Sequence, residues 1–152
     1  FEHRVGGLEK NHNGVLSSDP ANHELMCAER EEKIQRIAGF IPELEVNGPA
    51  SGRLLVVGWG GTYGHILSAV EEVRAEGAEL SFAHFDYIKP LPKNTAEVFA
   101  GFDTILVCEL NSGHFAAYLR NIFRDRNFIQ CNKVQGQPFL VHEIVESIKK
   151  AL

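Results

Sequence analysis

Residues 53–64 read RLLVVGWGGTYG, and this stretch decides the fold. The continuous apolar run 54–57 is typical of a strand that is buried on both faces. The glycines after it predict a tight turn, and apolar residues then recur at helical spacing at Ile66, Val70 and Val73. A buried strand that turns directly into an amphipathic helix predicts an α/β fold with a parallel sheet.

Predicted strands and helices continue to alternate to the end of the chain. Further strands are predicted over 80–85, 104–108 and 128–133, the last of them weaker and at an edge. Helices are predicted over 63–76 and 95–99, then around Phe115, Leu119, Ile122 and Phe123, and finally around Ile144, Val145, Ile148 and Leu152. Right-handed crossovers then give a three-layer sandwich, with a mostly parallel sheet of four to five strands covered on both faces.

The first fifty residues have a different character. Residues 1–18 are rich in Gly, Asn and Ser without a period, which predicts an irregular arm. Asp19-Pro20 predicts a helix start, with a polar helix that runs to about Ala38 and ends at Gly39. Because its apolar positions are sparse, we expect this helix to lie across another domain or chain.

Pro42, Gly48 and Pro49 predict a linker after that helix. We therefore divide the chain into 1–50, an arm with a helix and a linker, and 51–152, an α/β domain. The first residue is Phe1 rather than methionine, so we expect the sequence to be a piece of a longer polypeptide.

Composition narrows the class of protein. The chain has 152 residues, of which 44% are apolar and 23% charged, and a net charge of −5, which argues against nucleic-acid binding through general positive charge. Its apolar stretches are far shorter than the ~20 residues that cross a bilayer, so no membrane partner is expected. Three cysteines without a C-x-x-C pair favour neither a disulfide framework nor structural zinc, and a reducing cytoplasm is the expected location.

Polar residues and glycines gather in the loops that follow the predicted strands. In open α/β sheets, ligands and partners meet the loops at the carboxyl ends of the strands. We therefore expect these residues, called the rim residues below, to face a partner or a ligand. They are Trp59, Gly60, Gly61, Thr62, Tyr63, Gly64, Lys93, Asn94, Glu109, Asn111, His114, Lys133, Gln135 and Gly136.

The glycine loop allows two interpretations. Asp86 follows Gly64 at a distance that suits a dinucleotide site, so the loop is a candidate cradle for the phosphates of CoA or a nucleotide. Its spacing, however, is G-x-G-G-x-x-G rather than G-x-G-x-x-G, and a bulky Trp59 sits inside it. The other interpretation is a tight strand-to-helix turn that needs small residues for close approach of the backbone.

The other loops also leave alternatives open. Lys93 and Asn94 either present a cation and an amide, or are a solvated lysine and a helix cap. Glu109 and Asn111 either anchor a ligand or, for Glu109, pair with Lys93.

No catalytic centre can be assembled from the remaining residues. His84 is expected in the core, whereas His65 and His114 lie better placed near helix starts. Cys108 is expected to be buried and inert. We predict no catalytic residue and no metal ligand, because no nucleophile–base pair and no metal-ligand spacing is found.

Taken together, the motifs resemble a known family. The chain resembles the α subunit of 2-oxoacid:ferredoxin oxidoreductases over essentially all of its length, most nearly the 2-oxoglutarate type. The strings that carry the resemblance are GLEKNHNG (7–14), SSDPANHELM (17–26), EKIQRIAGFIPELEVNGP (32–49), LLVVGWGGTYG (54–64), FDYIKPLPKNT (85–95), ILVCELNSGHFA (105–116) and NKVQGQPF (132–139).

The resemblance implies a domain like the transketolase C-terminal domain, placed after a thiamine-binding domain. The complete enzymes of this family decarboxylate a 2-oxoacid on thiamine diphosphate with Mg²⁺, pass electrons through iron–sulfur clusters to ferredoxin, and form an acyl-CoA. The resemblance implies that this part holds none of these cofactors and is inactive alone. Its rim residues would then face the β subunit and the thiamine-binding domain. His114 departs from the glutamine that is usual in the family at this position.

Overall fold

The computed structural model describes residues 6–152, and the chain divides between Phe40 and Ile41 into two compact units. The part of the predicted arm that covers residues 1–5 lies outside the described residues. Among the helices of the described residues, none combines the length and the apolar character that a membrane crossing requires.

The first unit is built around one polar helix, as the sequence predicts. Helix α1 spans Pro20–Arg36, and the short 3-10 turn η1 follows over Ile37–Gly39. The carboxylate of Asp19 accepts a hydrogen bond from the N–H of Ala21 at 3.1 Å, which caps the helix start. No residue of α1 is buried.

Ion pairs hold the loop before α1 against that helix. One carboxylate oxygen of Glu9 lies 2.6 Å from Nδ1 of His23, and the other accepts from the Arg30 guanidinium at 2.7 Å. These two partners, Arg30 first, hold the pKa of Glu9 below its ordinary value. The arm is therefore ordered locally by ion pairs rather than by an apolar core.

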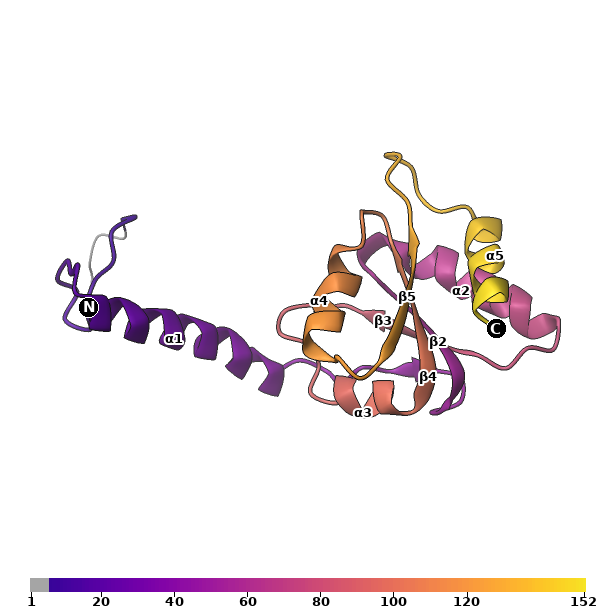
Figure 1. The fold of residues 1–152 in the computed structure, drawn as a ribbon, viewed down its shortest axis with the longest axis horizontal. Helices are drawn as coiled ribbons and strands as arrows, with labels where there is room; N and C mark the ends of the chain where they lie inside the picture. The colour runs from indigo at the N-terminus through magenta and orange to yellow at the C-terminus, as the bar shows by residue number, and fades with distance from the viewer. Residues whose placement is uncertain (1–5) are drawn as a thin grey trace. The chain divides into compact units, whose positions relative to one another are not determined.

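The second unit contains a five-stranded sheet in the order β1-β3-β2-β4-β5 (Figure 1). Strands β2 to β5 run parallel, and β1 pairs with β3 antiparallel. The strands are β1 Val46–Asn47, β2 Gly52–Trp59, β3 Ser81–Phe85, β4 Phe102–Glu109 and β5 Asn127–Asn132. The predicted mostly parallel sheet of four to five strands is confirmed, with β5 at one edge.

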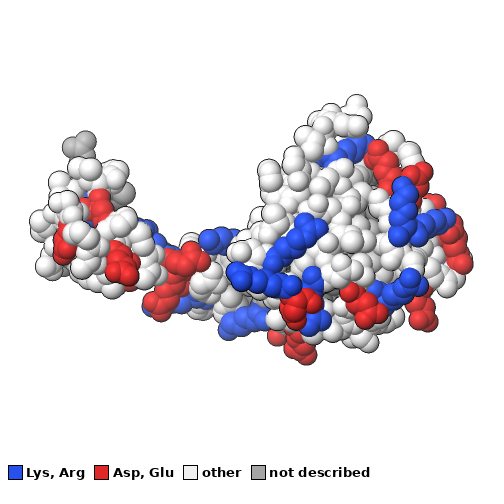
Figure 2. Space-filling model, in the orientation of Figure 1, with Lys and Arg blue, Asp and Glu red and all other residues white. Residues whose placement is uncertain are grey.

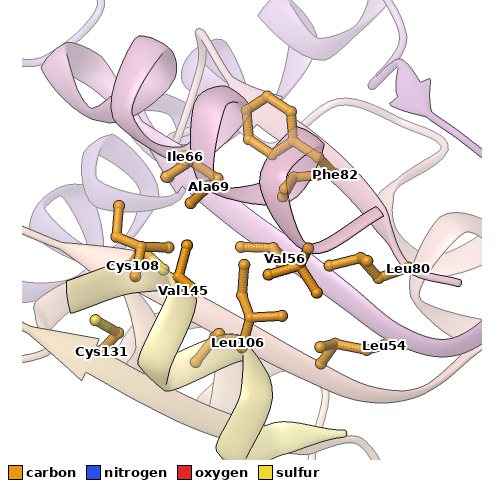
Figure 3. Close-up of a cluster of buried hydrophobic side chains, with 14 of the residues drawn as sticks. Leu54, Val56, Ile66, Ala69, Leu80, Phe82, Leu106, Cys108, Cys131 and Val145 are labelled. Atoms are coloured by element: carbon orange, nitrogen blue, oxygen red, sulfur yellow. The ribbon is translucent and has the colours of Figure 1, made fainter. Parts of the chain in front are cut away.

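Four helices cover the two faces of this sheet, which confirms the three-layer α/β sandwich. They are α2 Tyr63–Ala75, α3 Thr95–Ala100, α4 His114–Ile122 and α5 Val141–Ala151, with a 3-10 turn η2 over Gly60–Thr62. Helices α2 and α5 lie on one side and α4 on the other (Figure 1). Strand β2 alternates between the layers: Leu54 and Val56 pack under α2 and α5 (Figure 3), whereas Leu55 and Val57 pack toward α3 and α4.

Residues 41–50, which the sequence suggests as a linker, belong to the second unit in the structure. Leu44 is buried in the core, and Val46 pairs with Ala83 of β3. The short strand β1 has no periodic pattern of its own, because two residues are too few to show one.

Charged side chains of both signs are interspersed over the α/β unit on the face drawn in Figure 2. This distribution agrees with the modest net charge of −5.

Candidate functional site

The parallel strands end at one edge of the sheet, as the rim prediction requires. Trp59 pairs with Phe85, Gly58 with Cys108, and Glu109 with Asn132, so the ends of β2 to β5 lie at the same level. The loops that carry the rim residues therefore leave the sheet along one edge.

The glycine loop has the features of a tight strand-to-helix turn. A Cβ on Gly58 would collide with Cδ1 of Ile66 and lie 2.6 Å from the Thr62 hydroxyl oxygen, so any larger residue would force these side chains to move. Gly60 has a φ of +58°, which favours glycine. The Thr62 hydroxyl accepts from the N–H of Trp59 at 3.1 Å and donates to the carbonyl of Trp59 at 2.9 Å. Close packing and turn geometry therefore explain the loop without a phosphate.

Glu109 is fully buried and serves the fold. Its carboxylate accepts hydrogen bonds from the N–H groups of Phe115 at 2.9 Å and Ala116 at 3.0 Å, in the first turn of α4. A carboxylate at this place satisfies two helix donors and complements the positive end of the helix dipole. The pairing with Lys93 that the sequence allows is not formed: Glu109 is fully buried beneath α4, whereas Lys93 is exposed.

Asn111 shapes the same loop. Its side-chain oxygen accepts from the N–H groups of Gly113 at 2.8 Å and His114 at 2.9 Å. Gly113 has a φ of +97°, which favours glycine. The absence of a side chain also lets the loop pass close to Gln130 and Asn132: a Cβ on Gly113 would lie 2.7 Å from the Gln130 amide nitrogen. The side chain of His114 is exposed beside this loop.

Lys133 is buried and holds the start of α5. Its ammonium donates to both oxygens of Glu143 at 2.8 and 2.9 Å, and Glu143 also accepts from the N–H of Leu140 at 2.8 Å. The hydrogen bond from Lys133 lowers the pKa of the Glu143 carboxyl. The backbone N–H of Lys133 donates to the carbonyl of Glu109 at 3.1 Å, so the loops after β4 and β5 are joined.

Asn94 joins two segments that lie far apart in the sequence. Its side chain accepts from the N–H of Leu44 at 2.8 Å and donates to the carbonyl of Leu44 at 3.0 Å. Asn94 stands at the N-cap position of α3, as one interpretation of the sequence expects. Its side chain, however, makes no hydrogen bond to the helix, so the expected side-chain cap is not formed. Lys93 beside it is exposed.

The structure thus sorts the rim residues into three groups: one half-buried aromatic residue, side chains bonded within the fold, and exposed residues. Trp59 is half-buried, with its ring centroid 6.3 Å from that of Phe115. The side chains used inside the fold are those of Thr62, Asn94, Glu109, Asn111 and Lys133. The exposed residues are Gly60, Gly61, Tyr63, Gly64, Lys93, His114, Gln135 and Gly136.

A cavity beside the glycine loop was missed by sequence reasoning. Its volume is about 690 Å³, and its walls include Tyr63, His84 and the carboxylate-bearing residues Glu43, Glu45 and Asp86. These carboxylates disfavour a phosphate-bearing ligand there. The sequence holds one hint of this cavity, the two glutamates of PELEV (42–46). They come close to β3 only because strand β1 pairs with β3, and that strand was not predicted.

His84 forms one wall of this cavity rather than part of the closed core. The ring is half-buried and packs edge-on against Tyr63, with centroids 5.2 Å apart. Burial lowers its pKa, although Asp86 acts in the opposite direction. His84 therefore favours the neutral form at neutral pH.

Residues with metal-binding side chains also come together in the first unit. Donor atoms of Glu9, His23 and Cys27 all lie within 4.8 Å of one another. The guanidinium of Arg30, however, donates to Glu9 at 2.7 Å and to Cys27 at 3.2 Å, so a cation already stands among them. Sequence spacing could not reveal this cluster because Glu9 reaches it from outside the helix.

Comparison with known proteins first defines the class. No family model matches the chain. A split-gene transketolase superimposes on 71% of the chain and 41% of its own length, with a TM-score of 0.58 and 15% identity, and so shares the fold. The α/β part of the chain thus has a transketolase-like fold, and a helical arm precedes it.

More similar proteins then define the family. The chain is 39% identical over its whole length to the 2-oxoglutarate oxidoreductase subunit KorA of Mycobacterium tuberculosis, and 30% identical over 97% of its length to the α subunit of 2-oxoacid:ferredoxin oxidoreductase 2 of Aeropyrum pernix. The 2-oxoglutarate:ferredoxin oxidoreductase of Magnetococcus marinus, solved with 2-oxoglutarate, coenzyme A and succinyl-CoA, superimposes on 99% of the chain with a TM-score of 0.85 and 27% identity.

Over its whole length, the chain is homologous to part of the α subunits of 2-oxoacid:ferredoxin oxidoreductases. It spans 23% and 24% of the two curated relatives and 27% of the chain in the solved structure.

Proposed function

We propose that this chain is the C-terminal, transketolase-like domain of the α subunit of a 2-oxoglutarate:ferredoxin oxidoreductase. The complete enzyme would oxidatively decarboxylate the 2-oxoacid and form its acyl-CoA. The observation that carries the proposal is the 39% identity to KorA across the entire chain. The match to the oxidoreductase of M. marinus supports it.

Within that enzyme we assign this part a role in assembly rather than in turnover. The chemistry at the rim supports this role, because Glu109 and Lys133, its buried charged side chains, are bound to neighbours inside the fold. The exposed side chains of Tyr63, Lys93, His114 and Gln135 remain available to an adjoining polypeptide. We expect that polypeptide to be the β subunit or a preceding thiamine-binding domain.

The proposal also covers the cofactors and the location. Thiamine diphosphate, Mg²⁺ and the iron–sulfur clusters would be bound by other parts of the complex, with ferredoxin as electron acceptor and the cytoplasm as location. We expect none of the described residues of this domain to supply a nucleophile–base pair for the reaction. We therefore expect the isolated chain to be inactive.

The test uses the α subunit that contains this chain, purified with its β subunit. The combined variant Lys93→Ala, His114→Ala and Gln135→Ala should lower the recovery of the β subunit and CoA-dependent ferredoxin reduction by several-fold. A matched control is Arg53→Ala, since Arg53 is exposed at the opposite end of β2. Equal recovery of the β subunit in the rim and control variants would contradict the assembly role.

Turnover of 2-oxoglutarate by the isolated chain would contradict the proposal that catalysis takes place in other parts of the complex.

Calorimetric titration of the chain with CoA tests the alternative of a phosphate cradle at 58–64. We expect no binding heat, because the adjoining cavity is acidic and the glycines serve the turn. Saturable heat that disappears in a loop variant would favour the cradle instead.

A further inference from the structure

Two buried cysteines from different strands face each other in the core. Cys108 of β4 and Cys131 of β5 are paired in the parallel register. Neighbouring strands lie about 4.8 Å apart, and a disulfide requires Cα atoms about 4.4–6.8 Å apart. Both side chains belong to the cluster under α2 and α5, so they point to the same face of the sheet (Figure 3).

The surroundings give the two thiols different characters. Cys108 has no exposed surface, whereas Cys131 retains 9% at the edge strand. The hydroxyl of Ser147 on α5 donates to the sulfur of Cys131 at 3.2 Å. A donor to the sulfur stabilises the thiolate, which is the reactive form of cysteine.

Hydrogen bonding between the two thiols acts in the same direction. The hydrogen bond with Cys108 lowers the pKa of Cys131 to about 7, with smaller contributions from Ser147 and Lys150 against the opposing effects of burial and Glu143. The same hydrogen bond and burial raise the pKa of Cys108. Cys131 is therefore the better nucleophile and Cys108 the proton-bearing partner.

We propose that Cys108 and Cys131 are a redox-active pair that forms a reversible disulfide when the protein meets a peroxide, with Cys131 as the attacking thiol. In the first step the Cys131 thiolate attacks one peroxide oxygen, the O–O bond breaks, and a sulfenic acid forms with release of hydroxide. In the second step the Cys108 sulfur attacks the sulfenic sulfur, and its proton leaves with the hydroxyl as water. Two thiols and one hydrogen peroxide thus give one disulfide and two waters.

The test treats the folded chain with hydrogen peroxide, removes the peroxide, unfolds the chain in denaturant, alkylates the remaining thiols and maps the peptides by mass spectrometry. We expect two of the three free cysteines to escape alkylation as a 108–131 linked peptide that dithiothreitol releases. The rate should rise about tenfold between pH 6 and pH 8, as the thiolate fraction of a pKa 7 group does.

Cys27 supplies the internal control, because it is exposed and lies in the other unit. If Cys108 and Cys131 both remain alkylatable at a dose that has oxidised Cys27, the proposal is overturned. Oxidation of Cys131 to a sulfinic acid with Cys108 intact would overturn it equally. A Cys27→Ser chain excludes links that run through Cys27.

Variants then separate the two roles. Cys131→Ser keeps a group that can bond Ser147 and should abolish the link. Cys108→Ala should divert Cys131 to sulfinic acid, because the second thiol is missing. The peptide map of the unmodified chain does not depend on either variant folding, so its result decides the proposal alone.

Discussion

Helices α1 and α5 show how differently the two units are stabilised. The α1 helix has 17 residues and buries none of them, whereas the 11 residues of α5 bury Ile144, Val145 and Ile148. The first helix is held by a capping aspartate and surface ion pairs, which contribute little in water. The second helix is held by an apolar face that the sheet covers. The comparison teaches that the α/β unit is stabilised by its own apolar core, whereas α1 is a polar helix without buried side chains.

The largest effect should come from truncating the buried face of α5. Ile144→Ala is expected to lower the free energy of unfolding by about 2–5 kcal/mol, because it leaves a cavity in the core. Leu25→Ala on α1 should change it by less than about 0.5 kcal/mol, since Leu25 is exposed. Urea unfolding followed by circular dichroism measures both variants, and Trp59 fluorescence reports on the α/β unit alone. An equal loss for Leu25→Ala would break the comparison.

The next effect concerns a buried polar contact of the sheet unit. Glu109→Ala should cost about 2–4 kcal/mol, because two buried N–H groups of α4 lose their acceptor. Glu109→Gln keeps one acceptor oxygen and should lose less. Thermal unfolding of the three proteins tests this order, and a Gln variant less stable than the Ala variant would contradict the contact.

A smaller effect should appear only as a function of pH. The Glu143 pKa is depressed in the folded state by Lys133, so the folded chain binds fewer protons than the unfolded one in acid. This contribution is fully present above the ordinary glutamate pKa of about 4.3 and is lost as the pH falls through the depressed value. Lys133→Met should reduce that acid-dependent loss, leaving the smaller part that comes from the Leu140 N–H.

Lys149→Met is the matched control for this experiment. Lys149 forms an ion pair with Glu76 in which both side chains are about half exposed. Stability curves between pH 2 and pH 7 should therefore coincide in shape for Lys149→Met and the parent chain. If stability falls in acid as steeply for Lys133→Met as for the parent chain, the ion pair between Lys133 and Glu143 does not make the expected contribution.

The smallest effect should come from the cap of α1. Asp19→Ala is expected to lower the stability of that helix by about 1 kcal/mol. Because the helix lies in the other unit, Trp59 fluorescence should not record the change. Hydrogen exchange of the first turn of α1 should increase, and unaltered exchange there would show that the cap is dispensable.

Much of the fold followed from local patterns in the sequence. The buried strand at 54–57 and the helix start at Asp19-Pro20 are visible there because apolar runs and capping residues act locally. Strand β1 was missed because its pairing with β3 is a tertiary contact.

The rim was predicted as a set of residues, but the role of each side chain was not. Burial of Glu109 and Lys133 depends on where α4 and α5 begin relative to the sheet, which no spacing encodes. The acidic cavity escaped notice for the same reason, since Glu43 and Asp86 approach each other only in the folded chain.

Strand β2 sends Leu54 and Val56 into one apolar layer and Leu55 and Val57 into the other. Inserting or deleting one residue here would exchange the side chains of both layers at once, because alternate residues point to opposite faces. Length variation among relatives should therefore be found in the turns and be absent from this central strand. For protein engineering, 54–57 is the segment to leave intact when grafting loops onto the scaffold.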